Sequence, residues 1–167
     1  RESRRRCKRP ITGRGWVGPP RVIPSTTDPE RADLAMHVQL SILCDKAHIR
    51  PDGKMDVQGV FSHLSAPGFP AKQDRMILVT TIEWDRTDEG RNKFRVDLLT
   101  PDGRPALTVD GHTDVERQPV DRPPPRTQLI LPLEGVIFPQ PGPYNFQIRI
   151  KGRKLRGPSL FLIEQES

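Results

Sequence analysis

The sequence predicts an all-β protein, an antiparallel β-sandwich of seven or eight strands. From Met36 onward, short runs of residues alternate between apolar and polar with a period of two, which places alternate side chains on one face of a strand. Turn sequences rich in Pro, Gly and Asp separate these runs, and no window of ten or more residues carries a good helical stripe. Because a sheet with one apolar face must cover it with another layer, we expect two facing sheets, with a closed barrel as the alternative.

Residues 1–35 differ from the rest in composition. They are rich in Arg, Pro and Gly and hold nine Lys/Arg against four Asp/Glu, whereas residues 36–167 hold 18 against 17, so most of the net charge of +6 lies in the first segment. Few large apolar residues are present to offset an ordering cost of roughly 1–2 kcal/mol per residue, so we expect disorder. Met36 is the first methionine and lies where the alternation begins. We therefore hypothesise that residues 1–35 lie upstream of the natural start, with a β-sandwich domain over 36–167.

The first strands follow directly from the alternation. A strand beginning near Met36 is predicted to line one face with Val38, Leu40 and Ile42. Residues 50–54 form a turn sequence, with proline presetting φ and glycine accepting a positive value. A second strand is expected over Met55–Phe61, with Gly59 marking a bulge. The stretch 65–70 is expected to interrupt regular structure.

The middle of the chain predicts a central strand and a hairpin. The strand 76–84 is apolar on both faces near its middle, which is typical of a central position. The next strand directs Phe94, Val96 and Leu98 inward and Lys93, Arg95 and Asp97 outward. Residues 101–104 (Pro-Asp-Gly-Arg) give the strongest hairpin signal in the chain, and the return strand directs Leu107, Val109 and Val115 inward.

The last strands follow a proline-rich link over 119–125. Their alternating apolar residues are Leu129, Leu131 and Leu133, then Tyr144, Phe146, Ile148 and Ile150, and a last strand is predicted over 160–163. The stretch Pro141-Gly142-Pro143-Tyr144 is similar to the opening of late strands in immunoglobulin-like sandwiches, where a turn delivers a tyrosine to the corner of a sheet. We therefore expect an immunoglobulin-like sandwich, which by itself says little about function.

Three sequence pieces together carry a family resemblance. They are Leu43-Cys44-Asp45-Lys46-Ala47, Gly53-Lys54-Met55-Asp56-Val57-Gln58-Gly59-Val60-Phe61 and Phe69-Pro70. With the late Gly142-Pro143-Tyr144-Asn145-Phe146, they resemble an uncharacterised family of small bacterial proteins of unknown function. The likeness covers about residues 36–165. It implies a cytoplasmic β-sandwich and assigns no catalytic residue.

Composition excludes several classes of protein. The two cysteines, Cys7 and Cys44, leave the domain no internal pair to cross-link, which fits a reducing compartment. No stretch approaches the 18 apolar residues of a membrane span, and the N-terminus lacks the apolar segment of a signal peptide. We expect a cytoplasmic protein that makes no contact with membranes.

Candidate chemistry is sparse. Asp110, His112 and Asp114 share one strand face and form a polar surface cluster, which we interpret as an exposed strand face in preference to a metal or acid–base site. Five cations crowd one predicted hairpin and are candidates for binding a polyanion: Arg149, Lys151, Arg153, Lys154 and Arg156. We interpret the proline run 122–126 as a stiff crossover between sheets. We expect no catalytic residue, no cofactor and no bound metal.

These observations favour a non-enzymatic binding or interaction module that binds a protein partner or self-associates. The alternative is a protein that binds nucleic acid or another polyanion through the 149–156 hairpin and the N-terminal segment. A weaker alternative is an enzyme or small-ligand-binding domain that uses the loops 64–69 and 139–143 at one end of the sandwich.

Overall fold

The computed structural model describes residues 36–166, which form nine β-strands and no helix. The strands are β1 (His37–Ile49), β2 (Met55–Phe61), β3 (His63–Ala66), β4 (Ala71–Glu83), β5 (Gly90–Leu99), β6 (Pro105–Val115), β7 (Arg126–Phe138), β8 (Gly142–Ile150) and β9 (Arg153–Glu164). The segment 1–35, for which we predicted disorder, lies outside the described residues. Within the described part, no helix has the length and apolar character that crossing a bilayer requires.

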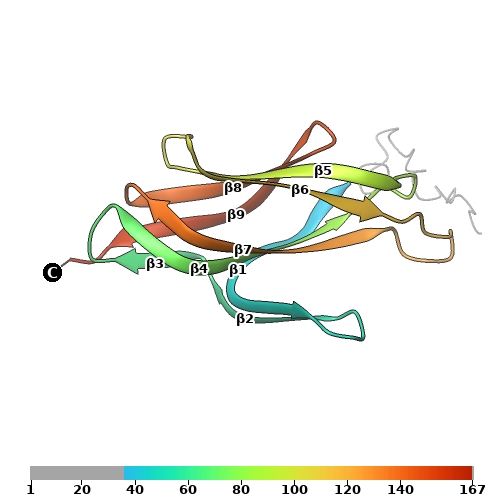
Figure 1. Cartoon of the computed structure of the whole chain (residues 1–167), viewed down its shortest axis with the longest axis horizontal. Coiled ribbons are helices and arrows are strands. Elements are labelled where there is room, and N and C mark those ends of the chain that lie inside the picture. Colours follow the sequence, from blue (N-terminus) through green and yellow to red (C-terminus); the bar gives the residue numbers. More distant parts are fainter. Residues whose placement is uncertain (1–35, 167) are drawn as a thin grey trace, which may run out of the picture.

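The strands form two sheets that face each other (Figure 1). One sheet has four strands in the order β2-β1-β4-β7, and the other has five in the order β3-β9-β8-β5-β6. All neighbours are antiparallel except β3 and β9, which pair in parallel. The prediction of an all-β protein with two sheets is confirmed, and the barrel alternative is wrong.

The described residues hold one strand more than the sequence predicted. The additional strand is β3, which occupies part of the 65–70 stretch that we expected to be irregular. It escaped prediction because it has only four residues and pairs with β9, nearly a hundred residues later, without a hairpin turn beside it. The irregular segment begins at Pro67 and contains a cis Phe69–Pro70 peptide bond.

The main core lies between the two sheets. Strand β4 is central, and its Ile77, Leu78 and Val79 are all buried, as the apolar run predicted. The apolar residues predicted for the other strands contribute to this core or pack against it: Phe94, Val96, Leu98, Leu107, Val109, Val115, Leu129, Leu131, Leu133, Tyr144, Phe146, Ile148, Ile150, Leu160 and Leu162. Within these runs, the alternation of apolar and polar residues therefore located the core face of each strand.

Strand β1 departs from its predicted alternation. The pairing of β1 with β4 shifts register between Val38 and Leu40. Val38 packs against the main core, whereas Ile42 packs on the opposite face of the sheet and Leu40 is 39% exposed. The prediction that Val38, Leu40 and Ile42 share one face is wrong because a bulge inserts one residue and reverses the alternation.

The end of β1 extends beyond its pairing with β4 and forms a hairpin with β2. Only the part of β1 up to Cys44 pairs with β4, and the remainder pairs with β2 alone. In Figure 1, β2 lies on the side of the four-stranded sheet away from the second sheet. Met55 and Val57 from this hairpin pack against Cys44, Ile77 and Val79, which form a second, smaller apolar cluster.

Gly59 does not mark the register shift that we predicted. The offset between β1 and β2 is the same on both sides of it, with Cys44 opposite Val60 and Lys46 opposite Gln58. Gly59 instead has a φ of +67°, and a Cβ at this position would overlap the side chain of Asp45. Glycine is therefore required here by backbone conformation and by the close approach of Asp45.

Tyr144 closes one corner of the sandwich. It lies near the start of β8, is fully buried, and its hydroxyl donates to the Gln140 carbonyl at 2.8 Å while accepting from the Gln140 N–H at 3.3 Å. Its ring meets Phe138 edge to face, with centroids 5.0 Å apart. The predicted corner tyrosine is confirmed.

The proline run crosses from one sheet to the other, as predicted. It follows β6 of the five-stranded sheet and leads into β7 of the four-stranded sheet. The Trp84 N–H donates to the Pro125 carbonyl at 2.8 Å, and Arg86 donates to the Arg122 carbonyl at 2.8 Å. These bonds fix the crossover against the loop that follows β4.

Candidate functional site

The predicted polar cluster lies on the outer face of β6. Asp110 lies opposite Arg95 of β5, His112 opposite Lys93, and Asp114 lies one pair further along. Arg95 donates two hydrogen bonds to the Asp110 carboxylate, at 2.8 and 3.2 Å. The hydrogen bond from Arg95 holds the pKa of Asp110 below its usual value, and the same contact raises the pKa of Arg95.

The same arrangement pairs His112 with a cation. Nε2 of His112 lies 2.6 Å from a guanidinium nitrogen of Arg91 and accepts its hydrogen bond. Across residues 36–166, no three His, Cys, Asp or Glu side chains come together in a way that could hold a metal ion. Asp110 and His112 are each hydrogen-bonded to an arginine of the neighbouring strand β5.

The structure divides the five cations of the predicted basic hairpin into two groups. Lys151 forms an ion pair with Asp88, and Arg153 donates to the Met36 carbonyl at 3.1 Å, so both are engaged at the end of the sandwich. Arg149, Lys154 and Arg156 instead lie on the outer face of β8 and β9. Only these three share a surface.

Cations of β5 extend this surface, and we did not include them in the predicted site. Arg95 lies directly opposite Arg149 of β8, which lies directly opposite Lys154 of β9. Arg91 and Lys93 continue the series along β5. The cationic face is thus defined by six side chains on three adjacent strands: Arg91, Lys93, Arg95, Arg149, Lys154 and Arg156. The i, i+2 spacing of Arg91, Lys93 and Arg95 in the sequence indicates that these cations share one face of β5. The sequence does not show that β8 and β9 lie beside that face, because this depends on the strand order.

The cationic face carries an excess of positive charge. Its six cations share the outer face of the sheet with three carboxylates, Asp97, Asp110 and Asp114, which leaves three positive charges in formal excess. The whole stretch 36–167 has an excess of only one. Asp97 is 5% exposed, accepts from Thr108 at 2.7 Å and lies 3.4 Å from Arg149. The three carboxylates all lie on β5 and β6, where they balance the three β5 cations, so the formal excess belongs to Arg149, Lys154 and Arg156 on β8 and β9. No ion pair within the described residues engages Lys154 or Arg156.

Two hollows open on this face. One, of about 540 Å³, is bordered by Arg91, Lys93, Arg95, Asp110 and His112, with Phe94 and Gly111 completing its lining. The other, of about 370 Å³, lies at the β8–β9 register shift and is bordered by Leu99, Asn145, Gln147, Lys154 and Arg156. The amide side chains of Asn145 and Gln147 place hydrogen-bonding groups beside the two unpaired cations of β9.

Apolar side chains follow the cations along β9. Phe161 is 51% exposed and Ile163 is 42% exposed, and both lie on the outer face because the alternating residues Leu160 and Leu162 are buried on the inner face. Phe161 is the register partner of His63 in β3 and of Pro143 in β8. The outer face of β9 thus passes from cations at one end to an exposed aromatic ring at the other.

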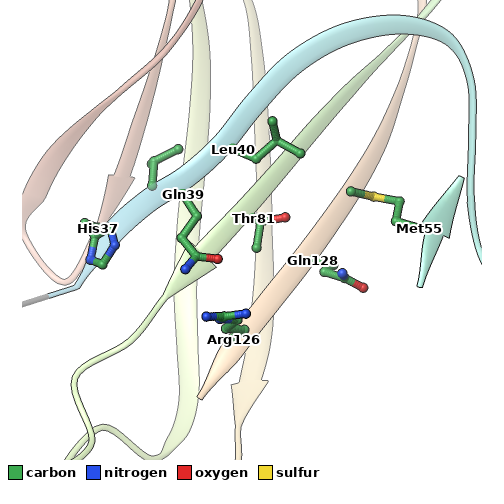
Figure 2. Close-up of a pocket in the computed structure, with 8 residues that line it drawn as sticks. His37, Gln39, Leu40, Met55, Thr81, Arg126 and Gln128 are labelled. Carbon is green, nitrogen blue, oxygen red and sulfur yellow. The ribbon is translucent and has the colours of Figure 1, made fainter. Parts of the chain in front are cut away.

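A further hollow, of about 620 Å³, lies on the outer face of the four-stranded sheet. Figure 2 shows Leu40 from β1 and Met55 from β2 near Thr81 from β4, with Arg126 and Gln128 from β7. Glu83 binds Arg126 at 2.8 Å and accepts from Gln39 at 2.6 Å, so these polar groups hold one another across three strands. This hollow lies on the opposite side of the molecule from the cationic face.

The two loops considered for an end-loop site lie at one end of the sandwich (Figure 1). The pairing of Ala71 with Phe138 brings the start of β4 close to the end of β7, beside these loops. Residues 64–66 of the first loop belong to strand β3, and Gln140 in the second is bound to Tyr144. Both segments therefore contribute to the framework of the sandwich.

No curated protein matches the chain. Among solved structures, the chain is similar to the Pseudomonas fluorescens alkylpurine DNA glycosylase AlkC bound to DNA containing an abasic site analog, with 9% identity and a TM-score of 0.35. That match covers 78% of this chain and 30% of the glycosylase, and its TM-score is too low to support a conclusion about fold or function. A match of family sequence to residues 39–162 shows that the chain belongs to the Family of unknown function (DUF6941).

Proposed function

We propose that this chain is a non-enzymatic binding module whose partner is a polyanion, bound on the cationic face of the five-stranded sheet. The observation that carries the proposal is the row Arg95–Arg149–Lys154, in which like charges lie directly opposite one another on three neighbouring strands. Like charges in opposed positions destabilise a sheet. A ligand that carries phosphate or sulfate groups would offset this cost.

The strand spacing sets the length of this row of cations. Neighbouring strands lie about 4.8 Å apart, so the row spans about 10 Å across three strands. Asp97 and Asp110 neutralise the part of the row near β5, and Lys154 and Arg156 stay available at β9. Binding there would release counterions from the polyanion, which makes the affinity depend on salt.

We also propose that the sandwich is immunoglobulin-like and that the protein acts in the cytoplasm. The parallel pairing of β3 with β9 and the corner formed by Tyr144 and Gln140 support the first proposal. The free, buried thiol of Cys44 supports the second, because such thiols are typical of reducing compartments.

The test is the affinity of the full chain for heparin and for duplex DNA, measured by fluorescence anisotropy from about 50 to about 200 mM salt. The informative variant is Lys154→Glu with Arg156→Glu. Its control is Lys54→Glu with Lys72→Glu, which makes the same change in net charge at two exposed lysines away from the face. Both variants keep residues 1–35, so any attraction between that segment and the polyanion contributes equally to the two affinities.

We expect the face variant to lose about tenfold in affinity at low salt and the control variant to lose much less. The slope of log affinity against log salt should also fall for duplex DNA, by about 0.9 for each phosphate contact removed. Equal losses in the two variants, or a wild-type affinity that ignores salt, would contradict the proposal.

A protein partner, or a second copy of this chain, is the second candidate. The observation that favours it is the free edge of β2, where Val60 is 60% exposed. Free edges present unpaired backbone groups to other strands. If copies associate there, the mass measured by light scattering should rise with concentration in the wild type and remain monomeric in Val60→Lys. If the wild type stays monomeric over about a hundredfold range of concentration, the hypothesis that copies of this chain associate at β2 is wrong.

A further inference from the structure

We propose that the polyanion is a single-stranded nucleic acid, which follows β9 with its phosphates on Lys154 and Arg156 and stacks one base on Phe161. This inference rests on the proposed function and names its partner class. It is motivated by three features of one surface: unpaired cations, hydrogen-bonding amides in a hollow, and an exposed aromatic ring.

The first step is the placement of the ring. Phe161 shares the outer face with Lys154 and Arg156 because the register shift between β8 and β9 keeps all three opposite outward residues of β8. Arg156 and Phe161 lie opposite Gln147 and Pro143, which are four residues apart on β8, so they are separated by about 13 Å at a rise near 3.3 Å per residue. A short oligonucleotide can contact both.

The second step is the state of the ring. Within residues 36–166, Phe138 and Tyr144 form the ring–ring contact, and Phe161 contacts no other aromatic ring. The Phe161 side chain is also 51% exposed. Its backbone N–H donates to the Ser62 carbonyl at 2.9 Å, and this fixes the strand that carries it. An exposed ring on a rigid strand gives a base a stacking platform at little entropic cost.

The third step is the hollow between cations and ring. Asn145 and Gln147 border it, and Ser159 donates to Asn145 at 2.8 Å, which orients that amide. Amide groups both donate and accept, as the edges of bases require. A duplex hides the faces of its bases inside the stack, whereas a single strand offers them, so the combination of ring and amides favours a single strand.

An acidic peptide is the competing partner. It would satisfy Lys154 and Arg156, but it offers no flat ring to cover Phe161 and gains little from the amides. The single strand uses all three features of the surface, and we argue for it on that ground.

The experiment compares three labelled ligands on the full chain: an oligothymidine strand, heparin and polyglutamate. The variants are Phe161→Ala, Phe161→Tyr and the control Ile137→Ala, which removes an apolar side chain that is 58% exposed on β7 of the other sheet. Thermal unfolding of each variant confirms that it is folded.

We expect Phe161→Ala to weaken oligothymidine binding about tenfold, within the range for loss of one stacked base, and to leave heparin binding unchanged. Phe161→Tyr should retain wild-type affinity because the ring persists, and Ile137→Ala should change neither ligand.

Three outcomes would overturn the inference. They are an oligothymidine affinity that is insensitive to Phe161→Ala, an equal loss for heparin, and polyglutamate binding as tight as that of oligothymidine. If Lys154→Glu with Arg156→Glu still weakens heparin binding in those cases, the proposed function stands without this inference. If no polyanion binds, both fail.

Discussion

Tyr144 is the residue whose contacts tie the β7–β8 turn to the core. Its hydroxyl bonds both backbone groups of Gln140, so Tyr144→Phe leaves this part-buried N–H and carbonyl without that partner. We expect the free energy of unfolding to fall by about 1 kcal/mol. Urea denaturation of the two proteins at neutral pH measures this difference, and equal midpoints would contradict it.

The same hydroxyl predicts a pH dependence. Burial raises the pKa of Tyr144 above the usual tyrosine value near 10. The pKa of Tyr144 is higher in the folded protein than in the unfolded chain. The stability that the protonated hydroxyl contributes is therefore fully present below the unfolded-state pKa and is lost as the pH rises through the folded-state pKa. Wild type should therefore lose more stability than Tyr144→Phe between about pH 8 and about pH 11. Parallel losses would show that the hydroxyl is not the group responsible.

Gly111 of β6 lies directly opposite Phe94 of β5, and the Phe94 ring packs closely against it. A Cβ on Gly111 would overlap the ring of Phe94, which is only 6% exposed and cannot swing into solvent without uncovering the core. Gly111→Ala should destabilise the protein by about 1–3 kcal/mol. The double variant with Phe94→Leu should be more stable than the sum of the two single effects, because the smaller side chain leaves room for the methyl group. Additive effects would argue against the overlap.

Residue-level predictions from the sequence succeeded where alternation was unbroken. The inward residues of β5, β6 and β8 and the shared face of Asp110, His112 and Asp114 all followed from a period of two. The prediction failed at Val38 because a one-residue bulge leaves no mark on a run of apolar and polar letters. The partners of Asp110 and His112 depended on register, which the sequence did not give.

The β1–β2 hairpin is the element that distinguishes the two outer faces. Its Met55 and Val57 cover Cys44, which is fully buried although it lies on the outer side of its sheet. Burial, with a smaller contribution from the charge of Asp45, raises the pKa of Cys44 and keeps it a thiol. The hairpin therefore protects Cys44 both by covering it and by suppressing the reactive thiolate.

This cover can be tested by thiol labelling in a Cys7→Ser background, where only Cys44 is counted. We expect Cys44 to react slowly in the folded protein and at least about tenfold faster when Met55→Ala and Val57→Ala remove the covering side chains. The control is Val60→Ala on the same strand, since Val60 is 60% exposed and covers nothing buried. Rapid labelling of the unmodified hairpin would show that it does not cover the sheet.

At the level of elements, turn chemistry was the reliable signal. The bounds Met55–Phe61 and the hairpin at residues 101–104 were predicted because proline and glycine in a turn have defined conformational preferences. Strand β3 was missed because a four-residue parallel pairing has no local signature. The curl of β2 over the sheet was missed because it depends on where β1 stops pairing with β4.

The two outer faces of the molecule differ in charge and in how they are covered. The β1–β2 hairpin covers the apolar cluster around Cys44 on the four-stranded sheet, whereas the five-stranded sheet leaves six cations and Phe161 exposed. The sequence predicted three of these cations, on β8 and β9, because they lie close together in the chain. The sequence did not place Arg91, Lys93 and Arg95 on the same surface, because β5 lies beside β8 in a strand order that does not follow the chain.

The central claim is that the cationic face binds polyanions, and amide chemical-shift mapping tests it most directly. A short heparin fragment is titrated into the isotope-labelled full chain. We predict that the shifted amides cluster on β5, β8 and β9 around Arg95, Arg149 and Lys154, and that the β1–β2 hairpin stays unchanged. Shifts confined to residues 1–35 or to the four-stranded sheet would contradict the account.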